Sequence, residues 1–364
     1  MSAIRNLERA DIPGVARLFS LVWRRSPDAS DRELERFFES TLLDHPWVDP
    51  ELPSFVATEG TEIVGFIGSN VRRMTFEGNP IRMVCSAHLI AHPRVRKRAV
   101  GARLLKTLLA GPQDLTMTDG ATDEMRRLWE ALGGTAVPLG AFSFARLFKP
   151  ASLGVDLYLS RRAPRVATGA ARLLAQPLDR MANLTLKHRP ATPPADAGIA
   201  PLSPEIMVTE IEAIATGMRL RSAYDTSYLS WLFDELDRVA ARGTLWADGV
   251  ARGRLWAEAV RTDKLLGWYV CHLREGGFCR VLQFAAEPKS GDEVFLHLSS
   301  RAHQVGAAAL YGRLEPQLVA PVTNSRCIIR PSDGRLLVHS SDPEIARTVR
   351  AGHALLTRMD GEWW

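Results

Sequence analysis

The sequence of 364 residues lacks the features that mark several large classes of protein. Its four cysteines are scattered without C-x-x-C spacing, which argues against a disulfide framework and against a zinc site. No apolar run approaches the roughly 18 residues of a membrane-spanning helix, and the first residues lack the apolar core of a signal peptide. We therefore expect a cytoplasmic protein with reduced cysteines, no metal and no membrane span.

A strong imbalance of charge is also missing. The 46 basic and 41 acidic residues leave a net charge of only +5. Part of the excess is local, because residues 151–205 carry seven basic and four acidic side chains, whereas residues 206–364 carry 19 of each. Nucleic-acid-binding domains show a larger basic patch or stripe. Nucleic acid is therefore not an expected partner, and local binding of an anion fits better.

The chain is longer than one hydrophobic core usually requires, and its 46% hydrophobic and 24% charged residues are ordinary for a globular protein. Two domains are therefore expected, residues 1–150 and 206–364. The residues between them, 151–205, predict a basic helical connector. It ends in a linker, because residues 190–204 contain five prolines.

Hydrophobic periodicity in the first domain predicts a mixed α/β fold with a central sheet. The expected order is strand, two helices, three strands, helix, strand, helix and strand, with a turn at residues 59–62 joining two of the strands. Residues 224–313 loosely repeat this order, which suggests a diverged internal duplication. The aromatic side chains of this second half could line a sugar cleft, but their spacing favours a core.

Residues 89–105 form the segment that carries chemistry. A strand ends at Pro93, a loop rich in basic residues follows, and a helix begins near Ala102. Such a loop presents backbone N–H groups at a helix N-terminus, where the helix dipole favours an anion. Ala99 and Gly101 have too little side chain to block a close approach. The pattern fits a phosphate or pyrophosphate site, and a solvated basic helix cap is the alternative.

The same segment resembles the acetyl-CoA signature of the GNAT superfamily of N-acetyltransferases, Gln/Arg-x-x-Gly-x-Gly/Ala after a strand that ends in x-Pro. Arg96 matches the signature arginine, Gly101 matches the second glycine, and Ala99 stands where the first glycine is usual. Residues 125–134 resemble the family's helix after the next strand, with Trp129 at the usual position of a tyrosine. The opening residues and the turn near residue 60 extend the resemblance over almost the whole first domain.

The resemblance implies a GNAT-type acyltransferase fold, in two copies, that moves an acyl group, acetyl above all, from acyl-CoA to an amine. Amino sugars, peptides and small amines are all open as acceptors. Backbone groups at the strand end would hold the pantetheine arm, and the loop would hold the pyrophosphate. The residues assigned to acetyl-CoA are Leu89, Ile90, Ala91, Arg96, Lys97, Arg98, Ala99, Val100, Gly101 and Ala102.

Catalytic groups are less clear than the cofactor loop. In many relatives the tyrosine protonates the leaving thiolate, which the indole of Trp129 cannot do. The first domain contains no tyrosine at all. His88, on the strand that leads into the loop, is the candidate general base, because the pKa of histidine lies near ~6.5. A core histidine is the alternative. His45 is a further possibility, while Glu59 and Glu62 are expected to face solvent.

The second half lacks the signature, because residues 287–292 follow its corresponding strand and include acidic side chains. We therefore expect a diverged GNAT-like domain without a CoA loop that shapes the acceptor cleft. Two other functions remain open. One is a catalytically weak acyl-CoA-binding module, since the family tyrosine is missing. The other is an interaction protein that uses the basic residues 161–189 on an anionic surface. The acceptor and the oligomeric state stay open.

Overall fold

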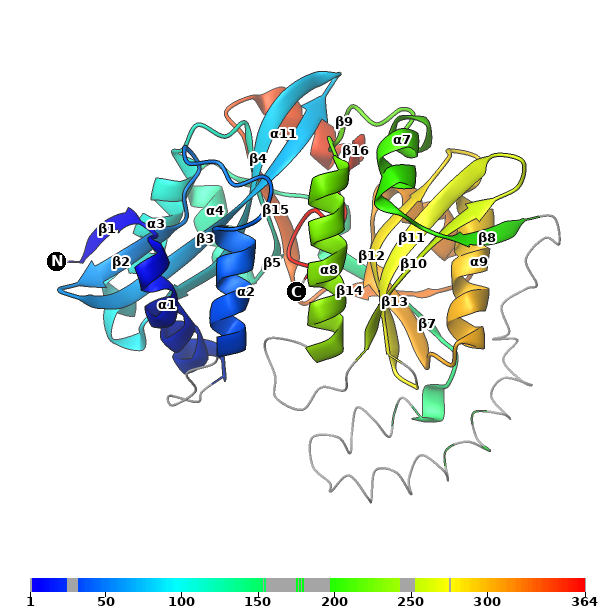
Figure 1. The fold of residues 1–364 in the computed structure, drawn as a ribbon, viewed down its shortest axis with the longest axis horizontal. Helices are drawn as coiled ribbons and strands as arrows, with labels where there is room; N and C mark the ends of the chain where they lie inside the picture. Colours follow the sequence, from blue (N-terminus) through cyan, green and yellow to red (C-terminus); the bar gives the residue numbers. More distant parts are fainter. Residues whose placement is uncertain are drawn as a thin grey trace.

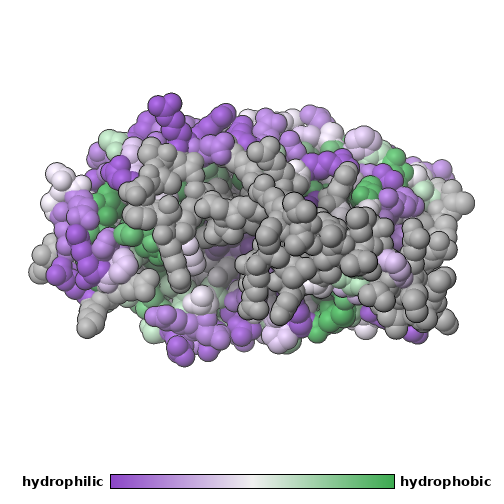
Figure 2. Space-filling model, turned by 90° about the horizontal axis from the view of Figure 1, so that it is seen from below, coloured by the Kyte–Doolittle hydropathy of each residue, from purple (hydrophilic) through white to green (hydrophobic). Residues whose placement is uncertain are grey.

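The computed structural model describes residues 2–24, 32–152, 197–242, 253–274 and 276–363, together with residues 154, 175, 177 and 179. Most of the predicted connector lies outside the described residues, so its helical character stays a prediction. In the described part of the chain, no helix is long and apolar enough to cross a membrane. On the face shown in Figure 2, hydrophilic side chains dominate the rim and hydrophobic ones form smaller groups.

Two mixed sheets, one for each half of the chain, lie side by side (Figure 1). In the first sheet the strand order is β1, β2, β3, β4, β5, β15 and β6, and β9 pairs with both β3 and β16. The bounds are β1 (Ala3–Asn6), β2 (Phe55–Glu59), β3 (Glu62–Phe76), β4 (Asn79–Ala91), β5 (Leu115–Ala121), β6 (Thr135–Ala136), β9 (Leu220–Ser222), β15 (Arg335–His339) and β16 (Ala354–Leu355).

The second sheet has the order β14, β7, β13, β12, β11, β10 and β8. Its bounds are β7 (Phe142–Leu147), β8 (Gly198–Pro201), β10 (Arg254–Arg261), β11 (Leu265–Leu273), β12 (Phe278–Ala286), β13 (Ala309–Arg313) and β14 (Ile328–Pro331). The helices are α1 (Ile12–Phe19), α2 (Arg32–Leu42), α3 (Val100–Leu109), α4 (Asp123–Ala131), α7 (Pro204–Ile214), α8 (Thr226–Arg242), α9 (Gly291–Gln304), α10 (Val319–Asn324) and α11 (Pro343–Arg350).

Helices cover both faces of the first sheet because successive strand residues point to opposite sides. Phe66 of β3 packs with α1 and α2, whereas the next residue, Ile67, packs with α3. The contact with α3 is close at Gly65, where an added Cβ would lie 2.8 Å from Cγ1 of Val100. The mixed α/β architecture and the turn at residues 59–62 are as predicted, with Gly60 in the left-handed region at φ +60°.

The second half repeats the element order of the first. Apart from the short β9, which has no counterpart, the series β8, α7, α8, β10, β11, β12, α9, β13, α10, β14, β15 corresponds in order to β1, α1, α2, β2, β3, β4, α3, β5, α4, β6, β7. This repetition agrees with the expected duplication of the fold, which stays a prediction. The repeat begins at β8, inside the predicted proline-rich linker. The prediction there was wrong because Pro201 ends a strand and Pro204 opens α7, both of which are positions that tolerate proline.

The two halves exchange their last strands. Strand β7, from the first half, lies between β13 and β14 of the second sheet. Strand β15, from the second half, lies between β5 and β6 of the first sheet. Each sheet is thus completed by the other half, which covers backbone groups that would otherwise form an open sheet edge.

Side chains of both halves share one core. The cluster around α1 and α2 continues without a break into α7, α8 and the second sheet, and Figure 1 shows α8 between the halves. Trp47 stacks on Tyr228 of α8 with ring centroids 3.5 Å apart. Trp268, Tyr269 and Trp363 are buried, in line with the core interpretation of the aromatic residues in the second half.

A buried ion pair also crosses between the halves. Nη1 of Arg313 on β13 lies 3.0 Å from a carboxylate oxygen of Asp119 on β5, and their side chains are only 5% and 0% exposed. The other terminal nitrogen of Arg313 pairs with Glu315 at 3.0 Å. Burial makes each charge dependent on its partner, because removal of one leaves the other unsolvated.

We expect Arg313→Ala to lower the free energy of unfolding by about 3–5 kcal/mol, since it takes the nearest cation from two buried carboxylates, Asp119 and Glu315, and leaves Asp119 only Arg358 at 3.5 Å. Arg126, which pairs with Glu130 on the exposed face of α4, is the control. Arg126→Ala should cost less than about 1 kcal/mol. Denaturant titration measures both values, and equal costs would contradict the role given to the Asp119–Arg313 pair.

Candidate active site

The cleft of the first half forms where β4 and β5 separate. These parallel strands pair only at Met83 to Cys85 with Leu115 to Met117, and beyond that point no pair joins them. The β3–β4 register shifts between Phe66 and Gly68, which marks a bulge in β4. His88 lies in this bulge with φ +53°, a conformation that is uncommon for a residue other than glycine. The bulge turns β4 away from β5 and opens the sheet.

A cavity of about 480 Å³ occupies this opening. Its walls come from β4, β5, α4, the end of the helical segment after α1, and the C-terminal part of the chain. They consist of Trp23, Ser86, His88, Leu89, Thr118, Gly120, Ala121, Thr122, Glu124, Met125, Trp129, Arg358 and Glu362. Both apolar and ionisable groups face the cavity, as is usual for a small-molecule site.

The predicted anion loop follows β4 as a 3₁₀ turn, Pro93–Arg98, and leads into α3. Ala99, the residue before the helix, has φ +53°, which explains why glycine is the usual residue of the signature there. An added Cβ at Gly101 would meet no described atom within 4 Å. The fold therefore does not require glycine at this position, whereas close approach of a ligand to the helix N-terminus would.

Salt bridges already hold part of the basic loop. Arg94 lies 2.7 Å from a carboxylate oxygen of Glu62, and Arg98 lies 2.5 Å from one of Glu59. Glu59 and Glu62, which were expected to be merely solvated, thus anchor the loop to the β2–β3 turn. Exposed pairs of this kind contribute little stability, so an incoming anion could replace a carboxylate at small cost. The side chains of Arg96 and Lys97 lie outside the described part.

The other residues assigned to acetyl-CoA divide between the cavity and the core. Leu89 lines the cavity. Ile90 and Val100 are buried, and Ala91 pairs with Gly65 of β3. Ala102 is half-buried on α3. The side chains of Ile90 and Val100 therefore serve packing, and only their backbone groups are candidates for ligand contact.

His88 lines the cavity, but its ring is also packed among aromatic side chains. The ring meets those of Phe19, Phe37 and Phe38 edge-on, with centroids 5.4–5.9 Å apart. Burial lowers the pKa of His88 to about 3, so the imidazole is neutral at physiological pH and a weak proton acceptor. Burial likewise lowers the pKa of His45 to about 3, and His45 is not among the residues that line this cavity.

Glu362 is a cavity residue that the sequence analysis did not find. The hydroxyl of Thr118 donates to its Oε1 over 2.6 Å, and its backbone N–H donates to Asp119 over 2.9 Å. Burial, and then the charge of Asp119, raise the pKa of Glu362 to about 7. No local pattern marks Glu362, because its partners lie more than 240 residues earlier in the chain.

The corresponding opening in the second half is filled. Strands β12 and β13 pair only at Phe278 to Arg280 with Ala309 to Tyr311, as β4 and β5 do. Past this point the backbone N–H of Met359 donates to the carbonyl of Leu282 over 2.9 Å. The C-terminal segment thus lies against β12, where a ligand would lie in the first half. Among the described residues, no group of three or more potential ligands could hold a metal.

Comparison with known proteins identifies the first half. Residues 3–114 match the family model described as an acetyltransferase (GNAT) domain. The chain contains a GNAT domain. The match covers β1 through α3, ends just before β5 and includes the whole anion loop. The first half, which contains the matched residues, is called the GNAT domain below. A search of the curated proteins found no match.

Solved structures resemble the chain over both of its halves, not only over the GNAT domain. A GCN5-related N-acetyltransferase from Anabaena variabilis matches with a TM-score of 0.59 at 10% identity, over 94% of this chain and 74% of that one. A GCN5-related N-acetyltransferase from Kribbella flavida matches with a TM-score of 0.56 at 12% identity, over 94% of this chain and 72% of that one. N-myristoyltransferase from Saccharomyces cerevisiae with bound myristoyl-CoA matches with a TM-score of 0.54 at 11% identity, over 93% of this chain and 82% of that one. At these identities the likeness shows the fold alone.

Ala99 offers a test of the loop geometry of the GNAT domain. Ala99→Gly should raise the free energy of unfolding by about 0.5–1 kcal/mol, because the left-handed conformation costs alanine roughly 1–2 kcal/mol and the flexibility of glycine offsets part of the gain. Ala102→Gly, inside α3, should lower it by about 0.5–1 kcal/mol. Thermal unfolding separates the two, and destabilisation by Ala99→Gly would show that the loop is not held as described.

Proposed function

We propose that the GNAT domain transfers an acyl group, acetyl above all, from acyl-CoA to an amine such as an amino sugar, a peptide or a small amine. Two observations carry this proposal: the cavity at the β4–β5 separation, which Leu89 of β4 lines, and the open N-terminus of α3 at Gly101, into which β4 leads. A thioester and an anionic phosphate group need these two environments side by side. Cytoplasmic location stays a prediction of the sequence.

The residues would divide the work as follows. Backbone groups of Leu89 to Ala91 would hold the pantetheine arm beside β4, where the partner strand has turned away. Backbone N–H groups and basic side chains from Arg96 to Ala102 would hold the pyrophosphate at the N-terminus of α3. Positioning of the amine against the thioester then supplies much of the acceleration.

Trp129 supports a second candidate function. Its side chain lines the cavity, is almost fully buried and replaces the tyrosine that is usual in the family. An indole cannot protonate the leaving thiolate, so a domain that binds acyl-CoA but turns it over slowly is the alternative. His88 remains a proposed base, although its low pKa makes it a poor proton acceptor.

Gly101→Glu tests the binding site. A glutamate in the first turn of α3 should not harm folding, because the added Cβ meets no described atom and a carboxylate suits a helix N-terminus. We expect micromolar binding of acetyl-CoA by wild-type protein and loss of binding in the variant, by calorimetry, with unchanged thermal unfolding. Gly198→Glu, on β8, is the control, since its nearest neighbour would be an oxygen at 3.8 Å.

Absence of binding by wild-type protein would overturn the proposed function. Binding followed by amine-dependent release of free thiol would identify an acyltransferase, whereas binding without turnover over a panel of amines would favour the acyl-CoA-binding module. Equal loss of binding in Gly198→Glu would show that the effect of Gly101→Glu is not local.

A further inference from the structure

The C-terminal segment, residues 356–363, connects the two halves at the cavity. On one side the N–H of Met359 donates to Leu282 of β12. On the other side the N–H of Glu362 donates to Asp119 of β5, over 2.9 Å. Its residues are buried except for Arg358 and Glu362, which are partly exposed and line the cavity. One short segment therefore fills the opening between β12 and β13 in the second sheet and also forms a wall of the cavity in the first half.

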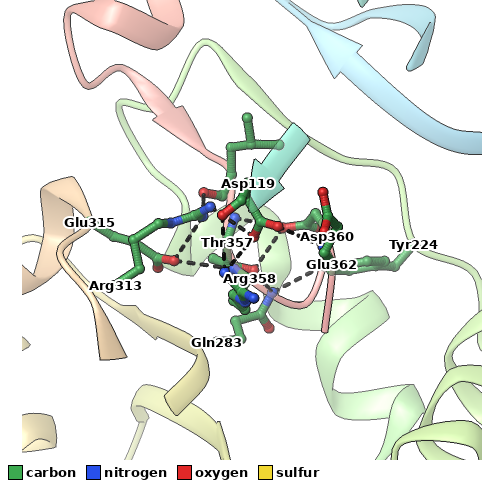
Figure 3. A network of polar contacts seen from close by, with 10 residues as sticks. Asp119, Tyr224, Gln283, Arg313, Glu315, Thr357, Arg358, Asp360 and Glu362 are labelled. Atoms are coloured by element: carbon green, nitrogen blue, oxygen red, sulfur yellow. Dashed lines mark hydrogen bonds and ion pairs between the residues drawn. The ribbon is translucent and has the colours of Figure 1, made fainter. Parts of the chain in front are cut away.

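Asp360 fixes this segment. Its carboxylate accepts hydrogen bonds from the hydroxyls of Ser222, Tyr224 and Thr357 and from the backbone N–H of Thr357, over 2.5–2.8 Å. The buried guanidinium of Arg72 donates to its backbone carbonyl over 3.1 Å. Figure 3 shows Asp360 with Tyr224 and Thr357, beside Asp119. A carboxylate with this many donors holds one geometry, so the residues that follow it are placed precisely.

Two glycines let the segment reach β5. An added Cβ at Gly361 would lie 2.6 Å from a carboxylate oxygen of Asp119. One at Gly120 would lie 2.8 Å from Oε2 of Glu362. In the described part of the chain this oxygen accepts no hydrogen bond, while Oε1 accepts one from Thr118. Glu362 thus presents a held carboxyl group with one oxygen available at the cavity.

We propose that Glu362, delivered by the second half, is the proton acceptor for the amine in the cavity of the GNAT domain. The inference rests on the proposed acyl transfer. As the amine nitrogen forms its bond to the thioester carbon and the carbon–sulfur bond breaks, the Glu362 carboxylate takes one N–H proton. The thiolate leaves with the bonding pair and is protonated from water, because Trp129 cannot supply the proton. The products are an amide and free thiol.

The charges around Glu362 suit this role. Asp119 on β5 and Cys85 on β4 lie on the side of the first sheet, Arg280 on β12 on the side of the second, and Arg358 on its own segment. Burial and Asp119 raise the pKa of Glu362 to about 7, while Arg358 acts in the opposite direction. A proton acceptor works best when its pKa lies near the working pH. Glu124 and His88 are the other ionisable groups that line the cavity with Glu362 and Arg358.

Glu315 provides a matched control. Burial raises its pKa to about 7 as well, and it belongs to the same network through Arg313 and the backbone N–H of Arg358. It does not line the cavity. Glu362→Gln should lower kcat/KM roughly 10²–10⁴-fold and remove its rise with pH near 7, while leaving the affinity for acetyl-CoA in place. Glu315→Gln should keep the pH profile.

The outcomes separate the two proposals. If wild-type protein binds no acetyl-CoA, or releases no thiol with any amine, the proposed function fails. If wild-type protein turns over and Glu362→Gln keeps its rate and pH profile, the proposed function stands and Glu362 is not the proton acceptor. Equal losses in Glu362→Gln and Glu315→Gln would also overturn the proposal, because they would show a structural effect of the network.

Two charge changes should move the pH profile in opposite directions. Asp119→Asn removes a negative charge and should lower the pKa of Glu362, which shifts the rise of kcat/KM to lower pH. Arg358→Gln removes a positive charge and should shift it to higher pH. Shifts in the same direction, or none, would overturn the assignment. If Asp119→Asn does not fold, the shift in Arg358→Gln alone decides.

The unliganded protein gives a second readout that does not depend on activity. Infrared spectra should show the carbonyl stretch of protonated carboxyl groups fading as the pH rises through about 7, as the pKa values of Glu362 and Glu315 require. Each Gln variant should remove its own part of this signal. An unchanged signal in Glu362→Gln would show that Glu362 does not lose its proton near pH 7, and this would remove the basis for its role.

Discussion

The buried carboxylate of Asp119 is the group on which the arrangement of the molecule depends. It pairs with Arg313 of the second half at 3.0 Å and accepts the backbone N–H of Glu362 at 2.9 Å. The guanidinium of Arg358 donates to the backbone carbonyl of Asp119 over 3.1 Å. A buried charge must keep its partners, so these contacts fix the second half and the C-terminal segment on β5 at once. The wall of the cavity is therefore as well defined as the interface between the halves.

The two halves use the same opening of the sheet for different purposes. In each, a pair of parallel strands separates after three residue pairs. In the GNAT domain a bulge at His88 and an anion loop accompany the opening, and a cavity of about 480 Å³ remains. In the second half the chain's own residues, among them Met359, occupy the opening. The exchanged strands β7 and β15 then join the two sheets, so the second half supports the cavity of the first.

The departures from the family signature have distinct physical meanings. Ala99 adopts the left-handed conformation that glycine would adopt at lower cost, so the loop keeps its shape at the expense of stability. Trp129 places an aromatic ring against the cavity, as the family's tyrosine does, but it lacks the acidic hydroxyl of tyrosine. A carboxyl group with a pKa near 7 in the same cavity offers proton transfer by another route. Structural likeness to acyltransferases at 10–12% identity shows the fold and leaves such chemistry to the site itself.

The sequence by itself determined what depends on neighbouring residues. Alternation and helical spacing predicted most elements of the first half, and the small residues around Gly101 predicted an anion loop at a helix N-terminus. Tertiary structure decided whatever depends on distant partners. It exchanged β7 and β15 between the sheets, buried His88 among aromatic rings, and brought Glu362 to Thr118, 244 residues earlier in the chain. Local periodicity tells which face of an element is buried, but it does not tell which distant element covers that face, and burial by distant elements is what sets the pKa values of the cavity.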